Sequence, residues 1–178
     1  MENKINYTEA FVDTLYSFAT KPIPEKIKAE ARKCLLDCTG SLLGGVPAMR
    51  ARIDKYLDQQ PACPDGALVI GHNRRASLQN AALCNALSMH VLEMDDGHRF
   101  STVHLSATVV PALLAVGEYY GLTMDDLIRG MVVGYEAGIR MGRCVQPAHR
   151  ARGFHSSGTV GTLGAAMAVA AALKFSRE

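Results

Sequence analysis

The sequence contains no tryptophan, and aromatic residues make up only 6% of its 178 residues. β-Sheets are usually rich in aromatic and β-branched side chains, whereas this sequence is rich in Ala, Gly, Leu and Val. That composition favours closely packed helices. The length suits one domain, or a large part of one, with a sizeable core. We therefore expect an all-α fold in which residues 1–178 form a single helical bundle of about six to eight helices.

A strong excess of charge of either sign is also lacking, because the formal net charge is only +2. The densest group of basic residues has none of the interleaved aromatic residues typical of nucleic-acid surfaces. We interpret this group as loop charges, or at most as a site for an anionic small molecule, and expect no nucleic-acid partner. It comprises Arg140, Arg143, His149, Arg150 and Arg152.

No segment has the pattern of a signal peptide, and the first six residues are polar. Residues 156–173 carry no charge and are long enough to cross a bilayer. However, they consist largely of Gly, Ala, Ser and Thr, whose transfer into lipid gains little free energy. We expect a buried central helix there, no membrane partner and a cytoplasmic location.

Several catalytic motifs are absent as well. The five cysteines form no CxxC pair, and the sequence has no HExxH, GxSxG or GxGxxG motif. Redox, zinc, nucleophilic and nucleotide sites therefore have little support. Because the cysteines lie mostly within apolar helical patterns, we expect buried free thiols in a reducing compartment.

Apolar periodicity and capping residues predict helices separated by short turns. Gly44 to Pro47 is expected to end the second helix, and residues 67–71 are the only candidate strand. The expected helices cover residues 8–20, 24–43 and 48–59, then run from Ser77 towards a break at Gly97, from Ser106 or Thr108, from Thr123, and from about Ser156 to Leu173.

Two of these helices carry faces of small residues. Gly130, Gly134, Gly138 and Gly142 recur every four residues, although each costs roughly 1 kcal/mol of helix stability relative to Ala. The helix that begins near Ser156 has a similar face of Gly and Ala. We expect the two helices to pack at short distance, while an oligomer interface would use the same residues equally well.

Titratable residues are concentrated between residues 89 and 111. Carboxylates beside imidazoles can orient a histidine as a general base by fixing its tautomer. The same residue types can bind a divalent metal, although the spacing matches no recognised metal motif. A third interpretation is a polar helix end with solvated charges. The residues are Glu93, Asp95, Asp96, His98, Arg99 and His104, with His90 interpreted as a core histidine.

A second candidate is His155, which precedes the last predicted helix. Free backbone N–H groups and the helix dipole favour an anion at that end and hold a nearby imidazole neutral. A neutral histidine beside an anion site suits proton abstraction from a carboxylate substrate. Alternatively, Ser156 and Ser157 only cap the helix and His155 is a surface residue. Arg74 and Arg75 could clamp a carboxylate, but a solvated loop is the simpler interpretation.

Several blocks in order resemble the MmgE/PrpD family, which includes 2-methylcitrate dehydratase, cis-aconitate decarboxylase and iminodisuccinate epimerase. They run from about residue 8 to the end of the chain. The blocks are CLLDCTGSLLGG (34–45), NAALCN (80–85) leading to HVLEMDD (90–96), VPALLAVGE (110–118), GYEAGIR (134–140) and GFHSSGTVGTLGAA (153–166).

The resemblance implies a helical domain with a smaller lid domain, a homodimer or larger homo-oligomer, and acid–base chemistry on a small polycarboxylate without metal or other cofactor. Carried over by position, His104, His155 and Asp96 are the implied catalytic residues. Glu93, Asp95, His98 and Arg99 are the implied substrate-binding residues.

Two departures from the family pattern stand out. Leu105 follows the histidine where Pro is common. The lid domain and the later lysine, histidine and tyrosine of the family's active site are absent from these residues. We therefore expect the N-terminal helical portion of a 2-methylcitrate dehydratase-like lyase, poorly active by itself. The alternatives are a non-catalytic assembly module using the Gly/Ala faces, and a metal-dependent hydrolase built on Asp95, Asp96, His98 and His104.

Overall fold

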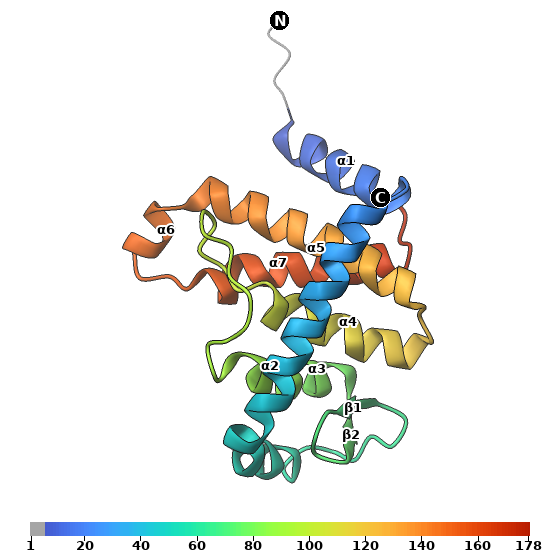
Figure 1. Ribbon diagram of the computed structural model, residues 1–178, viewed down its shortest axis with the longest axis vertical. Coiled ribbons are helices and arrows are strands. Elements are labelled where there is room, and N and C mark those ends of the chain that lie inside the picture. The colour runs from blue at the N-terminus through green and yellow to red at the C-terminus, as the bar shows by residue number, and fades with distance from the viewer. Residues whose placement is uncertain (1–5) are drawn as a thin grey trace, which may run out of the picture.

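The computed structural model describes residues 6–178 and is all-α, with one small hairpin (Figure 1). This confirms the predicted fold class. Within the described residues, α4 lies between α3 and α7, and α5 runs beside α7. The elements are α1 (Tyr7–Thr20), α2 (Glu25–Leu57), β1 (Ala67–Val69), β2 (Arg74–Ala76), α3 (Leu78–His90), α4 (Ser106–Tyr120), α5 (Met124–Val145), α6 (Ala148–Ala151) and α7 (Ser156–Ala172).

The main core lies where α2, α3, α4, α5 and α7 meet, and it consists of aliphatic, Met and Ala side chains rather than aromatic ones. This agrees with the scarcity of aromatic residues in the sequence. Its fully or almost fully buried members include Leu42, Met89, Leu105, Val109, Val110, Ile128 and Ala168.

The predicted break between residues 43 and 48 is wrong, because α2 continues through it to Leu57. Gly45 allows α3 to approach α2 closely: a Cβ atom there would lie 1.8 Å from the carbonyl oxygen of Ser88. Pro47 lies inside the helix, where it removes one backbone hydrogen bond and favours a kink. The glycine therefore serves packing between helices and does not end one.

The segment after β1 is a second strand, not the solvated loop that we predicted. β2 pairs antiparallel with β1, and Ala67 lies opposite Ala76. In the connecting turn, His72 is buried, and its Nδ1 lies 2.7 Å from Asp54 Oδ1. Arg75 forms an ion pair with Glu118 on α4, so its charge has a structural partner.

The predicted close packing of the two small-residue helices is confirmed for α5 and α7. A Cβ atom at Gly134 would lie 2.7 Å from both the Gly164 carbonyl oxygen and the Ala168 Cβ. Gly130 faces the Ala168 carbonyl oxygen at the same distance. The backbones of α5 and α7 therefore touch, and these small residues serve packing within the chain.

The other two glycines of α5 face the connection that precedes α4. A Cβ atom at Gly138 would lie 2.3 Å from Leu105, and one at Gly142 would lie 2.5 Å from the Ser101 side chain. The glycine face therefore also brings this connection against α5. That connection carries most of the predicted site residues.

Helix ends agree with the sequence in part. Ser77 caps α3, and Thr123 and Asp126 form the predicted capping box of α5. Asn6 caps α1 in place of Thr8, and α3 ends at His90, seven residues before Gly97. Residues 91–105 therefore form a loop, which gives the titratable residues more freedom to converge than one helix face would.

The five cysteines are free thiols. Burial raises the pKa of Cys38 to about 12 and that of Cys84 to about 11, so both remain protonated at neutral pH. Among residues 6–178, no helix combines the length and hydrophobicity needed to cross a membrane.

Replacing Gly134 with Ala should destabilise the domain, because the added methyl group would collide with the backbone of α7. We expect the Gly134→Ala variant to lose about 1–3 kcal/mol of unfolding free energy in urea. Gly40→Ala is the matched control, because Gly40 lies in the middle of α2 and a Cβ atom added there would meet nothing within 4 Å. This control should gain up to about 1 kcal/mol. Equal effects of the two substitutions would contradict the close packing of α5 and α7.

Candidate active site

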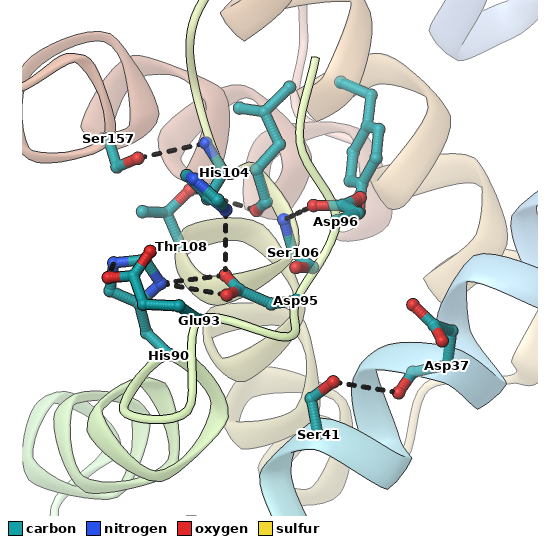
Figure 2. A network of polar contacts seen from close by, with 12 residues as sticks. Asp37, Ser41, His90, Glu93, Asp95, Asp96, His104, Ser106, Thr108 and Ser157 are labelled. Atoms are coloured by element: carbon teal, nitrogen blue, oxygen red, sulfur yellow. Dashed lines mark hydrogen bonds and ion pairs between the residues drawn. The ribbon is translucent and has the colours of Figure 1, made fainter. Parts of the chain in front are cut away.

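The loop of residues 91–105, between α3 and α4, presents most of the predicted site residues (Figure 2). Within the loop, the His98 N–H donates a hydrogen bond to the Val103 carbonyl oxygen at 2.9 Å, which holds these two parts of the loop together. Its end is tied to α7, because the His104 N–H donates to Ser157 Oγ at 3.0 Å. These backbone contacts fix His104 against the N-terminus of α7.

Two side chains of this loop, Asp95 and His104, meet His90 at the end of α3. His90 Nδ1, at the end of α3, lies 3.0 Å from both carboxylate oxygens of Asp95. His104 Nδ1 lies 3.6 Å from Asp95 Oδ2, and the two imidazole centroids are 5.1 Å apart. The Asp95 side chain is fully buried, whereas each imidazole is 30% exposed. Figure 2 shows Asp95 placed between the two histidines.

A cleft of about 650 Å³ opens beside this group. One wall is the loop, and the other comes from α6 and the segment that leads into α7. His155 lies 6.3 Å from His90 between ring centroids, and it lines the same cleft as His104. The predicted residues in the cleft wall are Glu93, His98, Arg99, His104 and His155, joined by Arg150 and Phe154.

His155 is the N-cap residue of α7, which runs for 17 residues. Its side chain caps no backbone N–H and is exposed to the cleft. Ser156 and Ser157 behind it are buried, and both accept hydrogen bonds. The serines do not cap the helix, contrary to one interpretation of the sequence. Ser157 accepts the His104 N–H and Ser156 accepts the Gln146 amide, while the imidazole of His155 lies beside the helix N-terminus.

The sequence matches the MmgE/PrpD N-terminal domain over residues 9–178. The chain belongs to the MmgE/PrpD family.

Two named relatives agree with that assignment. The cis-aconitate decarboxylase-like protein oryM of Aspergillus oryzae is 30% identical over 173 residues, which cover 92% of this chain and 36% of that protein. Cis-aconitate decarboxylase of Aspergillus terreus is 28% identical over 136 residues, covering 72% of this chain and 27% of the enzyme. The chain thus spans about a third or less of the length of these relatives.

In this MmgE/PrpD domain, Asp96 has different partners from Asp95. Its Oδ1 accepts the Ser106 N–H at 3.0 Å, at the start of α4, and its Oδ2 accepts the Tyr135 hydroxyl of α5. Burial and the Asp96 carboxylate raise the pKa of Tyr135. The phenol therefore stays protonated and donates a hydrogen bond to Asp96. Asp96 joins the loop to α4 and α5, and its catalytic assignment stays a prediction.

His98 is also held apart from the three-residue group, because its Nδ1 lies 2.7 Å from Ser101 Oγ. The four residues of the metal-hydrolase alternative therefore do not meet. Among residues 6–178, the group of His, Cys, Asp or Glu within metal-binding reach is His90, Asp95 and His104.

His90 and Arg150 lie at the cleft or beside it but are not among the site residues predicted from the sequence. His90 was interpreted as a core histidine because it follows the apolar spacing of α3. The signal was its position at the end of the helix, five residues before Asp95, where the chain can turn back. Arg150 was included only in a general basic group. It reaches the cleft because α6 and residues 152–155 fold back towards the 91–105 loop.

Removal of the Asp96 carboxylate should destabilise the domain. Asp96→Ala leaves the Ser106 N–H and the Tyr135 hydroxyl without their acceptor, so we expect a loss of about 1–3 kcal/mol in urea unfolding. Asp65→Ala is the control, since Asp65 is exposed and has no ion pair within residues 6–178, and it should change stability by less than about 0.5 kcal/mol. Wild-type stability of the Asp96→Ala protein would contradict this anchoring role.

Proposed function

We propose that this chain forms the histidine-bearing part of a lyase that acts on a small polycarboxylate by acid–base chemistry. The observation that carries the proposal is the position of His104 and His155 in one cleft, with the buried Asp95 carboxylate behind His104. Three imidazoles (His98, His104 and His155) and two guanidinium groups (Arg99 and Arg150) line this cleft, which suits a substrate with several carboxylates and a proton to be moved.

In this proposal, His104 is the better oriented of the two imidazoles. Its Nδ1 is buried and faces Asp95, so Nε2 is the nitrogen available to a substrate. A carboxylate behind Nδ1 favours the tautomer that carries a proton there and leaves Nε2 as the proton acceptor. Asp95, rather than Asp96, therefore holds the proposed general base in position.

His155 supplies the second proton-transfer group. It stands at the N-terminus of α7, where backbone N–H groups and the helix dipole attract an anion. A substrate carboxylate placed there would bring its α carbon between the two imidazoles. One histidine would then remove or return a proton at that carbon.

Arg99 and Arg150 are proposed to bind substrate carboxylates. Both line the cleft, and neither has a carboxylate partner within residues 6–178. Arg74, Arg75 and Arg140 are instead held in ion pairs. Guanidinium groups without a protein partner are suited to paired hydrogen bonds with carboxylate ligands.

The names of the relatives favour a substrate like cis-aconitate. Decarboxylation of such an acid breaks a carbon–carboxylate bond, releases CO2 and leaves an electron pair that takes a proton from an imidazolium. Dehydration and epimerisation also require a proton transfer next to a carboxylate. The proposed residues serve each of these reactions, and the relatives favour the first.

Because the relatives are longer, we propose that the cleft is one wall of a site completed by further polypeptide. We also propose that the protein assembles as a homodimer or larger homo-oligomer. Exposed apolar side chains favour assembly. They include Leu36 and Leu43 on α2 and Met94 in the 91–105 loop.

His104→Ala and His155→Ala should each weaken binding of cis-aconitate to this chain by about tenfold or more, without unfolding it. Histidine ring resonances in NMR titrations report binding site by site, and circular dichroism reports folding. His149→Ala is the control, because His149 lies outside the cleft wall. Unchanged affinity in both variants would favour a non-catalytic helical module.

Arg150→Gln should raise the dissociation constant of the same ligand about tenfold, because one charge-assisted hydrogen bond is lost. Arg152→Gln removes an equal charge two residues away but lies outside the cleft wall, so it should change affinity much less. Isothermal titration calorimetry distinguishes the two variants. Equal losses would mean that only the general positive field matters, and the assigned role of Arg150 would be wrong.

A further inference from the structure

The Asp95 carboxylate is fully buried, yet it lies on the 91–105 loop and not on a helix. Among residues 6–178, its side-chain hydrogen bonds come from one residue, His90, whose Nδ1 lies 3.0 Å from each carboxylate oxygen. His104 Nδ1 lies farther away, at 3.6 Å from Oδ2. The orientation of Asp95 towards His104 is therefore set by its contact with His90 (Figure 2).

The contact also determines which nitrogen of His90 carries a proton. An ionised carboxylate only accepts hydrogen bonds, so Nδ1 of His90 is the donor. Because this nitrogen is within hydrogen-bond distance of both oxygens, it opposes rotation of the carboxylate. A buried acceptor that loses its donor also loses free energy, since no water replaces the bond. His90 therefore both satisfies Asp95 and fixes its orientation.

His90 belongs to a firmly packed part of the domain. It is the last residue of α3, and the residue before it, Met89, is fully buried in the main core. The last turn of α3 also lies against α2, because a Cβ atom at Gly45 would be 1.8 Å from the Ser88 carbonyl oxygen. A side chain on a packed helix is held more precisely than one on a loop. His90 can therefore fix the position of a side chain on the neighbouring loop.

His90 is not placed to touch a substrate. The cleft wall includes His98, His104 and His155, whereas His90 lies behind it. The Nε2 of His90 lies 3.5 Å from the Glu93 carboxylate, so both of its ring nitrogens lie near protein carboxylates. This arrangement suits a residue that acts through another residue.

We propose that His90 is a positioning residue for His104. Its Nδ1–H holds the Asp95 carboxylate, and this carboxylate keeps the proton of His104 on Nδ1, so that Nε2 remains the proton acceptor. The inference rests on the proposed function, in which His104 moves the substrate proton. It adds that the proton-accepting form of His104 depends on a histidine outside the cleft wall.

The test measures the tautomer of His104 in the 178-residue chain labelled with ¹⁵N-histidine, using long-range ¹H–¹⁵N NMR spectra. Spectra are recorded at a pH of about 8, where imidazoles are ordinarily neutral. The His104 signals are identified by their loss in His104→Ala. The parent protein should hold His104 in the Nδ1–H form. His90→Leu removes the donor and should shift His104 towards the Nε2–H form.

His90→Asn is the matched variant, because its amide nitrogen stands where Nδ1 stands in histidine and can still donate to Asp95. It should keep His104 in the Nδ1–H form. Asn is a poorer helix former than Leu, so a general loss of structure at the end of α3 would give the opposite order. His72 is the internal reference, because its Nδ1 contacts Asp54 and its signals should not change.

Circular dichroism checks that each variant is folded. Should His90→Leu unfold, His90→Gln takes its place, because the Gln amide extends beyond the Nδ1 position. Three results would overturn the positioning role: an Nε2–H tautomer of His104 in the parent, an unchanged tautomer in His90→Leu, or equal shifts in His90→Leu and His90→Asn.

Cis-aconitate titrations separate this inference from the proposed function. A parent protein that binds no cis-aconitate but shows the expected tautomers would reject the lyase proposal and leave the control of His104 by His90 standing. Binding that is lost in His104→Ala, with an unchanged tautomer in His90→Leu, would support the lyase proposal and reject the positioning role.

Discussion

The backbone contact between α5 and α7 is the constraint on which the cleft depends. Gly134 and Gly164 let the two helices touch, and this fixes where the N-terminus of α7 lies. Ser157, in the first turn of α7, then holds the backbone of His104, while His155 stands beside the cleft. Larger side chains at the glycine positions would separate the helices and move both imidazoles. The helix propensity lost at these glycines is therefore offset by a packing contact that organises the site.

A second constraint is the buried carboxylate of Asp95. Two neighbouring aspartates have divided roles: Asp96 joins the loop to α4 and α5, and Asp95 turns towards His90 and His104. The division follows from the loop conformation, in which successive side chains point in different directions (Figure 2). Among the described residues, the ion-pair partners of the buried Asp95 carboxylate are these two imidazoles, which suits the group to proton transfer.

Several elements were predictable from local chemistry. The side chain of Ser77 caps the N-terminus of α3, and Thr123 and Asp126 cap the N-terminus of α5. The small-residue faces of α5 and α7 pack together, as the spacing of those residues predicts. The misplaced features depend on contacts outside the segment concerned. Gly45 resembles a helix end in the sequence, but it lets α3 approach α2, and its neighbour Ser88 is far away along the chain. β2 begins only a few residues after β1, but its two arginines give no strand pattern by themselves, and it forms by pairing with β1.

For the site, the sequence by itself determined which chemical groups are present: imidazoles, carboxylates and arginines are concentrated in two segments, and the chain matches the MmgE/PrpD family. Only the tertiary structure decided which of them meet. It placed His90 beside Asp95, drew Asp96 away to Tyr135, and brought Arg150 and His155 to the cleft of His104. The reason is that the identity of a side chain sets what it can bind, whereas its partners are set by loop conformation and by helices packed across the whole chain.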